Sequence, residues 1–395
     1  MKGISVLMVG IGGFAGAYLK KLLYDPHWAR FRITGAVDPY AQRSEFKEEL
    51  VRRGIPIYDT LEEFYRVHTA QLALLVTPVY LHAQQARYCM EHGSDVLCEK
   101  PLCTTWEDAK AMMEARDRTG RKLAVGFQWS FSEGILKWKE DIRNGLYGDI
   151  RRIKTIVYFP RTLDYYHRGT GWAGKRRLDS GEWILDSVAS NAAAHYLHNM
   201  LFLTGDRIDR SAEPEVMEAE VYRANPIEMF DTCALRIRTR DGVELLFYAT
   251  HAVPKDQERP PEIVMEAEKG QVTLDYEQGK EILSGHLDDG RTIGYERPGA
   301  DDMRKLFCMA SAIRENLPIP CVPETTLPHL KCILALADSF PETPAFPEKY
   351  ISYSEKTRQY TCKGLAQTLD ECWREWKLPG EGLAVWGKKP HEIYF

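Results

Sequence analysis

The feature that most constrains the fold is a glycine-rich turn near the start of the chain, in the stretch VLMVGIGGFAG. Gly10, Gly12 and Ala15 form the pattern G-x-G-x-x-A directly after an apolar run at residues 5–9 and before a helical pattern. Glycine at the first position permits a tight turn. Glycine at the second lets a pyrophosphate approach the backbone at the N-terminus of the following helix. Simple turn glycines are the alternative, but the position between strand and helix favours a dinucleotide-binding turn.

The first 126 residues alternate between short apolar runs and helical patterns. The runs are typical of buried parallel strands, and they lie at residues 5–9, 33–37, 72–76, 96–98 and 123–125. Thr60-x-x-Glu63 and Thr104-x-x-Glu107 are capping-box starts for two of the intervening helices. The alternation predicts a doubly wound α/β domain over residues 1–126.

After residue 127 the chain changes to long strands of alternating pattern. Within the stretch 215–297, Asp241-Gly242 and Lys269-Gly270 indicate hairpin turns. This predicts a second α/β domain with a large, mostly antiparallel open sheet. The same patterns predict helices at 132–145, 186–204, 301–315 and 326–339, and a strand at 150–159. The predicted second domain spans 127–340, and a C-terminal extension, 341–395, packs on the body.

The open sheet has a consequence for assembly. One of its faces should stay free after the helices pack, and monomers rarely leave such a face bare. We therefore predict a homodimer or homotetramer built through that face.

Charge and cysteine usage exclude several classes of partner. The net charge of the 395 residues is −5, so no basic excess indicates nucleic acid or an anionic membrane as a main partner. No apolar run reaches the roughly 18 residues that a membrane span needs. The nine cysteines are scattered without a CxxC pair. They indicate a reducing cytoplasm and mostly buried thiols rather than a disulfide framework or a zinc site.

Polar residues follow the predicted strands at their carboxyl ends, where ligands bind in such sheets. Asp38 ends the second strand, and its carboxylate would accept hydrogen bonds from ribose hydroxyls and repel a 2′-phosphate. This favours NAD over NADP, with nearby Arg43 interpreted as a solvated helix charge. Thr77, Pro78 and His82 follow the third strand in LLVTPVYLH; a helix-surface position is the alternative for His82.

The stretch DVLCEKPLCT places Glu99, Lys100 and Pro101 at the end of another strand. These motifs together, with GFQWSFSEG and NGLYGDIRRI further on, resemble the Gfo/Idh/MocA oxidoreductases over roughly residues 3–340. The resemblance implies a Rossmann domain, a second domain with an open sheet, and NAD(P)-dependent hydride transfer to or from a sugar or polyol. It implies these cofactor-binding residues: Gly10, Gly12, Gly13, Phe14, Ala15, Asp38, Thr77, Pro78, His82, Glu99 and Gln128.

Lys100 is the first candidate catalytic residue. A partly desolvated lysine beside an oxidised nicotinamide is shifted toward its neutral form. It could then hydrogen-bond a substrate hydroxyl and assist its deprotonation as hydride leaves. Glu99 could orient it. A structural Lys-Glu surface pair is the alternative.

His195 is the second candidate catalytic residue. The family pattern D-x-G-x-H-x-x-D corresponds here to NAAAHYLH, so Asn191 replaces the first aspartate and His198 the second. Their spacing predicts that Asn191, His195 and His198 share one helix face, and the resemblance implies that they contact substrate. The orienting carboxylate is missing unless Asp186 supplies it. Paired histidines could ligate a metal, but no third ligand is evident, so we predict no metal site.

The loop at 160–182 is rich in aromatic and basic residues. Trp172, with Tyr165 and Trp183, could stack on a sugar, and Lys175 or Arg176 could bind its oxygens. A solvated surface loop is the alternative.

The sequence thus predicts a cytoplasmic NAD-dependent oxidoreductase that acts on a carbohydrate-like alcohol or ketone. One alternative is an NAD-dependent glycoside-cleaving enzyme that uses transient C3 oxidation. Another is a non-catalytic NAD-sensing regulator, against which the Glu99-Lys100-Pro101 motif argues.

Overall fold

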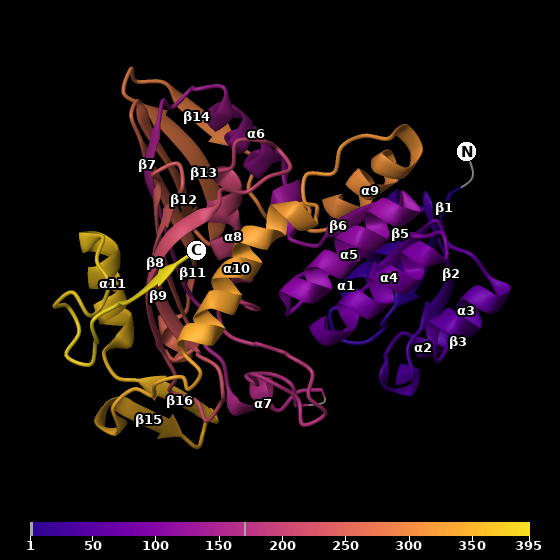
Figure 1. The fold of residues 1–395 in the computed structure, drawn as a ribbon, viewed down its shortest axis with the longest axis horizontal. Coiled ribbons are helices and arrows are strands. Elements are labelled where there is room, and N and C mark those ends of the chain that lie inside the picture. The colour runs from indigo at the N-terminus through magenta and orange to yellow at the C-terminus, as the bar shows by residue number, and fades with distance from the viewer. Residues whose placement is uncertain (1–2, 170) are drawn as a thin grey trace. The chain divides into compact units, whose positions relative to one another are not determined.

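The computed structural model describes residues 3–169 and 171–395 of the chain, so Thr170, within the predicted substrate loop, lies outside the described residues. The described chain forms two compact units (Figure 1). One comprises the described part of Met1–Gln128 together with Asp302–Pro323. The other comprises the described part of Trp129–Asp301 together with Glu324–Phe395. Each is treated below by itself.

The first unit is built on a six-stranded sheet in the order β3-β2-β1-β4-β5-β6, and every neighbouring pair is parallel. This is the strand order of dinucleotide-binding domains, and it confirms the predicted Rossmann fold. Its strands are β1 (Ile4–Val9), β2 (Phe31–Val37), β3 (Ile57–Tyr58), β4 (Leu72–Leu75), β5 (Asp95–Cys98) and β6 (Leu123–Val125). Its helices are α1 (Ala15–Tyr24), α2 (Lys47–Arg52), α3 (Leu61–Val67), α4 (His82–Glu91), α5 (Trp106–Thr119) and α9 (Arg304–Glu315).

Helix α9 belongs to this unit although it lies nearly two hundred residues beyond β6. The division predicted at residue 126 does not include this return of the chain. Leu306, Met309 and Ala312 are buried and show a regular helical pattern. Such a pattern identifies an amphipathic helix, but it carries no information about which domain receives the apolar face.

The second unit contains a nine-stranded sheet in the order β14-β13-β12-β11-β7-β10-β9-β8-β17. Only β7 and β10 among these neighbours are parallel, which confirms the mostly antiparallel open sheet. Its strands are β7 (Ile150–Tyr158), β8 (Pro214–Tyr222), β9 (Thr232–Thr239), β10 (Glu244–Thr250), β11 (Arg259–Ala267), β12 (Gly270–Glu277), β13 (Lys280–Leu287), β14 (Thr292–Tyr295) and β17 (His391–Tyr394). A separate hairpin pairs β15 (Ile351–Ser354) with β16 (Gln359–Cys362).

Helices cover one face of this sheet and the C-terminal segment covers much of the other. The main core packs α6 (Glu133–Arg143), α8 (Ala194–Leu203) and α10 (Pro323–Ser339) against the first face. On the opposite face, α11 (Leu365–Glu375) and its neighbours pack over β7 to β10 (Figure 1). The predicted bare face is therefore covered over these strands.

Polar contacts reinforce that cover. Lys154 on β7 donates to the carbonyl oxygen of Trp373 (2.7 Å), and its ammonium lies 4.2 Å from the centre of the Trp376 ring. Arg236 on β9 pairs with Glu381 at 2.7 Å. A solvent-facing sheet would not require these aromatic and acidic partners, so the C-terminal segment is an integral layer of the unit.

Helix α8 is shorter than the predicted helix at 186–204. It begins at Ala194, because the preceding serines bond locally instead of joining a helix. The Ser190 hydroxyl donates to the carbonyl oxygen of Leu185 (2.6 Å) and accepts from the amide of Ser187 (2.8 Å). Short hydroxyl side chains compete with helical hydrogen bonding in this way. Asn191 consequently lies in a turn before α8, not on its face.

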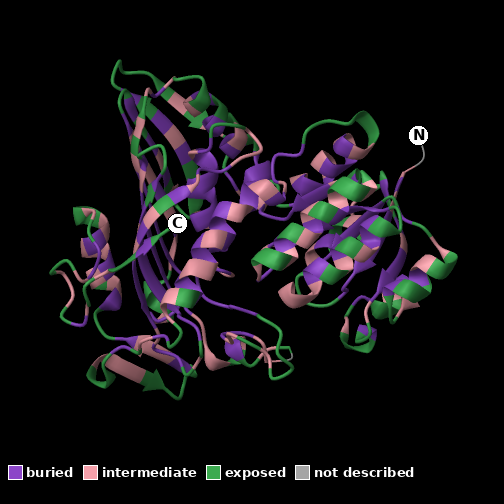
Figure 2. Ribbon diagram, in the orientation of Figure 1, coloured by how far each residue is buried: buried purple, intermediate pink, exposed green. Residues whose placement is uncertain are grey.

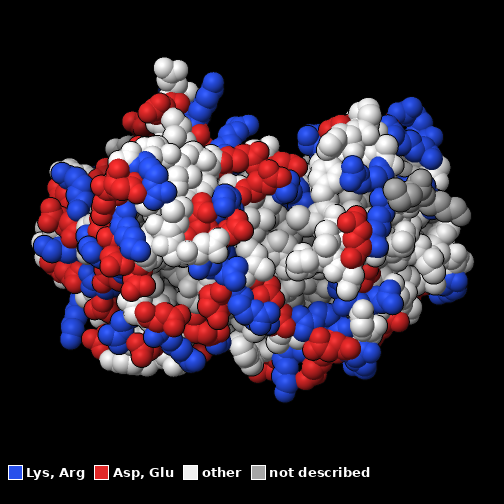
Figure 3. All heavy atoms as spheres, turned by 90° about the horizontal axis from the view of Figure 1, so that it is seen from above, with Lys and Arg blue, Asp and Glu red and all other residues white. Residues whose placement is uncertain are grey.

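Burial and charge follow the layers. The strands of both sheets are largely buried, while the helices alternate between buried and exposed residues (Figure 2). On the face seen in Figure 3, basic and acidic side chains are interspersed. Eight of the nine cysteines are buried, as predicted, and all are free thiols. None of the helices in the described chain is long and apolar enough to cross a membrane.

Candidate functional site

The glycine turn has the geometry that a dinucleotide-binding loop requires. Gly10 has a φ of +84°, and an added Cβ there would lie 2.7 Å from the carbonyl oxygen of Val76. At Gly12 and Gly13 an added Cβ would meet no atom of the described chain within 4 Å. Packing within the unit therefore explains Gly10, whereas the other two leave the backbone open to close approach. Phe14 is exposed, and Ala15 is the buried first residue of α1.

Asp38 directly follows β2 and closes the glycine turn. One carboxylate oxygen accepts from the amide of Ile11 (2.9 Å), and the other accepts from the amide of Tyr40 (2.8 Å). Each oxygen retains a further lone pair for a ligand. The side chain thus has a structural role in addition to the predicted contact with ribose.

His82 is buried, so the alternative of a helix-surface histidine is wrong. Its Nδ1 lies 2.9 Å from the carbonyl oxygen of Pro101, and its Nε2 lies 2.9 Å from that of Thr77. Burial lowers the pKa of His82, so a neutral ring donates to one of these oxygens. The histidine therefore joins the loops after β4 and β5. Thr77 also donates to Gln85 (2.5 Å), and Pro78 follows it in the same loop.

Glu99 is the centre of a buried polar network in the first unit. Its Oε1 accepts from the Tyr18 hydroxyl (2.5 Å) and from the Lys305 ammonium (2.5 Å). Its Oε2 accepts from the backbone amide of Lys100 (3.2 Å). Gly126 leaves room for this carboxylate, since an added Cβ there would lie 2.9 Å from it.

The network keeps the Glu99 carboxylate ionised. Burial by itself would raise the pKa of Glu99, but the ammonium and hydrogen bond of Lys305, with a hydrogen bond from Tyr18, lower it below its ordinary value. The charge of Lys305 thus balances that of Glu99, and the charge of Lys100 also contributes to the lowered pKa of Glu99. The alternative of a Lys-Glu surface pair is wrong, because the partner of Glu99 is the fully buried Lys305.

Sequence reasoning missed Lys305 and Tyr18. A signal for Lys305 exists: it precedes Met309 by four residues and Ala312 by seven, so it lies on the buried face of α9. A lysine at that position needs an acidic partner. Gln128, at the end of the first segment of this unit, donates to Asp302 (3.2 Å) and so joins the two chain segments of the unit.

In the second unit, Asp186 holds Asn191. The buried Asp186 carboxylate accepts from the Asn191 amide (2.8 Å) and from the backbone amide of Gly174 (2.6 Å). Asn191 also donates to the Tyr165 hydroxyl (3.4 Å). The family pattern has an aspartate at the position of Asn191. Here the carboxylate comes from Asp186, five residues upstream, and it orients the Asn191 side chain.

His195 and His198 differ in their surroundings. His195 is half-buried on α8, whereas His198 is buried and its Nε2 lies 2.9 Å from the Ser130 hydroxyl. Burial, followed by the charge of His329, lowers the pKa of His198 well below its usual range. His198 is thus a neutral core residue, which favours a packing role over the predicted contact with substrate. The described residues contain no group of three His, Cys, Asp or Glu side chains placed to hold a metal.

The residues predicted to form a sugar-binding loop make different contacts in the structure. Lys175 forms an exposed pair with Asp179 (3.5 Å). Arg176 donates to the carbonyl oxygens of Ala337 (2.9 Å) and Phe340 (2.5 Å), so it supports the fold. Trp172 lies against the guanidinium of Arg168, and Trp183 against that of Arg177.

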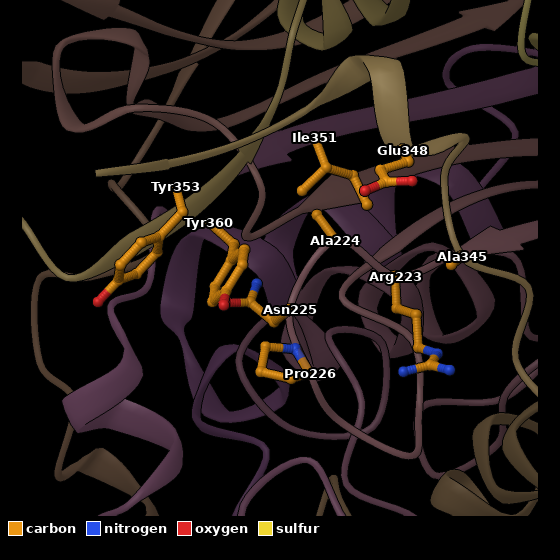
Figure 4. Close-up of a pocket in the computed structure, with 9 residues that line it drawn as sticks. All are labelled: Arg223, Ala224, Asn225, Pro226, Ala345, Glu348, Ile351, Tyr353 and Tyr360. Carbon is orange, nitrogen blue, oxygen red and sulfur yellow. The ribbon is translucent and has the colours of Figure 1, made fainter. Parts of the chain in front are cut away.

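A hollow of about 400 Å³ lies beside the β15–β16 hairpin of the second unit. Figure 4 shows the rings of Tyr353 and Tyr360 together at one end and Arg223 at the other. The guanidinium of Arg223 donates to the carbonyl oxygens of Thr343 (3.2 Å) and Ile227 (3.0 Å), and none of the predicted site residues lines the hollow. We assign it no role.

The fold and the first unit's geometry define a Rossmann-type dinucleotide-binding domain with a lysine at the carboxyl end of β5. Residues 4–127 match the family described as "Oxidoreductase family, NAD-binding Rossmann fold". Over these residues the chain is similar to the Gfo/Idh/MocA oxidoreductases.

Several named relatives are dehydrogenases. The chain is 28% identical over 204 residues to 1-carboxy-3-chloro-3,4-dihydroxycyclo hexa-1,5-diene dehydrogenase of Comamonas testosteroni, covering 51% of this chain and 48% of that protein. It is 28% identical over 146 residues to inositol 2-dehydrogenase of Rubrobacter xylanophilus, covering 37% and 41%. The chain spans about half or less of the length of these curated relatives.

A fold similar to that of most of the chain is also found in solved structures. The WlbA dehydrogenase of Bordetella pertussis, solved with NADH and UDP-GlcNAcA, matches with a TM-score of 0.68 and 23% identity. The match covers 86% of this chain and 96% of that one.

Proposed function

We propose that the protein is an NAD-dependent oxidoreductase that interconverts an alcohol and a ketone on a sugar, polyol or related carbohydrate. The observation that carries the proposal is Lys100 at the carboxyl end of β5, next to the compensated Glu99–Lys305 pair. The Glu99 carboxylate accepts from the backbone amide of Lys100, which holds this residue at the sheet edge where ligands bind. The named relatives, which include an inositol dehydrogenase, support this class of substrate.

The chain's own residues provide binding and proton transfer. The glycine turn and Asp38 would hold the dinucleotide, and bound NAD would supply the hydride acceptor. Lys100 would take the proton of the substrate hydroxyl. Asn191, oriented by Asp186, and His195 would bind substrate oxygens.

The direct test is NAD reduction by the purified protein with a panel of sugars, inositols, uronates and glycosides. We expect NADH to accumulate with at least one free sugar or polyol. Release of a sugar from a glycoside without net NADH would instead indicate redox-assisted cleavage, and NAD binding without turnover on any compound would indicate a sensor.

The cofactor preference is the first prediction. NAD should bind more tightly than NADP, because the Asp38 carboxylate repels a 2′-phosphate. Asp38→Asn keeps an acceptor for the Ile11 amide and removes the charge, so it should narrow the difference between the two affinities. Titration calorimetry with both cofactors measures this. NADP affinity equal to that of NAD in the unsubstituted protein would contradict the proposal.

Assembly is the second prediction. We propose a homodimer or homotetramer, but the C-terminal layer over β7 to β10 restricts contact through the outer sheet face to β11 to β14. Ile282 on β13 is exposed there, and Ile282→Glu should weaken the association. Light scattering at micromolar protein measures the mass. A monomer mass for the unsubstituted chain would refute the prediction.

A further inference from the structure

Two guanidinium groups lie against one phenol ring in the second unit. The Cζ of Arg168 is 3.5 Å from the centre of the Tyr165 ring, and the Cζ of Arg161 is 4.8 Å from it. Arg168 also lies 4.8 Å from the centre of the Trp172 ring. We call Arg161, Tyr165, Arg168 and Trp172 the arginine cluster.

No carboxylate within residues 3–169 and 171–395 lies within 4.0 Å of either guanidinium of the cluster. Arg168 donates to the carbonyl oxygen of Tyr165 (2.5 Å) and Arg161 to that of Pro160 (3.4 Å). The Nε of Arg161 is buried and has no hydrogen-bond partner in the described chain. A half-buried cation without an anionic partner is costly, and buried polar atoms are normally satisfied.

Three other half-buried arginines of the same unit are paired with carboxylates, whereas Arg176 and Arg223 each donate to two backbone carbonyls. Arg152 pairs with Glu266 (2.7 Å), Arg236 with Glu381 (2.7 Å), and Arg259 with two acidic side chains (2.6 Å each), Glu262 and Asp370. Arg161 and Arg168 each donate to one nearby carbonyl oxygen, so the cluster has fewer partners than either group. Its remaining donors are available to a group that the chain itself does not provide.

The described acidic and titratable groups around the cluster form no ion pair with it. The buried Asp186 carboxylate accepts from the amides of Asn191 and Gly174 instead. Burial and then the charge of Arg161 lower the pKa of His251 to about 3, so this histidine is neutral near pH 7. The two guanidiniums thus lie against Tyr165 without a directly paired carboxylate from the described chain.

The cluster adjoins the residues proposed to contact substrate. The Tyr165 hydroxyl lies 3.4 Å from the Asn191 amide, and Asn191 precedes His195 by four residues. Guanidinium forks match the paired oxygens of a carboxylate or phosphate. We propose that the arginine cluster binds an anionic group of the substrate, so that the enzyme selects a sugar acid or sugar phosphate over the neutral sugar. This specificity rests on the proposed function.

The test compares matched neutral and anionic probes by titration calorimetry with the full chain and saturating NAD. The probes are glucose, glucuronate and glucose 6-phosphate, then galactose and galacturonate, then myo-inositol and inositol 1-phosphate. We expect an anionic member of at least one set to bind about 10- to 100-fold more tightly than its neutral partner, the effect of one or two charged hydrogen bonds. Comparing the sugar acids with the sugar phosphates shows whether the cluster prefers a carboxylate or a phosphate.

Variants then assign the selectivity to the cluster. Arg161→Gln with Arg168→Gln should abolish the preference for the anion and leave the affinity for the neutral sugar unchanged. The variant Arg161→Lys with Arg168→Lys keeps both positive charges and should retain part of the preference for the anion. Arg238→Gln, which removes one positive charge from an exposed pair with Glu215, is the control and should change nothing.

Equal binding of neutral and anionic probes, equal loss of both in the double Gln variant, or no anionic probe binding at millimolar concentration would each overturn the inference. NAD binding is measured separately in the same protein. If the unsubstituted protein did not bind NAD, that result would contradict the proposed function but not the anion specificity.

Discussion

Replacing Lys100 by Met should lower kcat by about 10²–10⁴, the usual effect of losing a proton-transfer partner. Methionine has a similar length but no titratable amine. NAD binding should persist, because the glycine turn and Asp38 are untouched. Steady-state kinetics on the substrate found in the screen, with calorimetry for NAD, measures both quantities. Lys110→Met, which removes an exposed amine from α5, is the control.

His195→Asn should behave differently from Lys100→Met. The carboxylate near this part of the second unit, Asp186, orients Asn191. We therefore expect His195 mainly to bind a hydroxyl, so its replacement should raise KM more than it lowers kcat. Near-normal kcat in Lys100→Met together with lost turnover in His195→Asn would show that the roles are reversed.

Replacing Lys305 by Met should reduce the free energy of unfolding by about 3–5 kcal/mol, because it leaves the buried Glu99 without its cation. Urea unfolding at pH 7 measures the change. The double variant Lys305→Met with Glu99→Gln should recover part of the loss, since a neutral amide still accepts from Tyr18. No recovery in the double variant would show that the packing of α9, not the charge, accounts for the effect.

The pH dependence of the Lys305→Met defect has a defined sign. In the unsubstituted protein the pKa of Glu99 is lowered, so its stabilising contribution is present above the unfolded value of about 4.5 and is lost as pH falls through the folded-state pKa. Without Lys305, burial should raise that pKa instead, and the variant should lose stability as pH rises. The difference between the two proteins should therefore shrink toward pH 5. A difference independent of pH would exclude an ionised Glu99.

The local motifs were predictable because each is a short stretch with one physical requirement. Gly10 needs a positive φ next to Val76, and Asp38 follows a strand at the edge where ligands bind. The period of two in residues 215–297 likewise indicated the open sheet. These signals depend only on residues that are close in the sequence, so they can be predicted from it directly.

Contacts between distant segments were not predictable in the same way. Lys305 meets Glu99 across 206 positions, and its burial was readable while its partner was not. Lys175 and Arg176 were predicted together as candidates for binding sugar oxygens, because loop composition does not show which cation donates to backbone carbonyls, as Arg176 does. The start of α8 was misjudged because Ser187 and Ser190 form a local hydrogen-bonded turn.

The return of α9 to the first unit imposes an order on biosynthesis. A ribosome adds about 5–20 residues per second, so Lys305 emerges about 10–40 s after Glu99. During that interval the six strands of the first sheet are already available, but the carboxylate at the end of β5 has no ammonium beside it. The nascent Rossmann sheet must wait for residues 129–301 of the second unit to be translated before this buried charge is balanced.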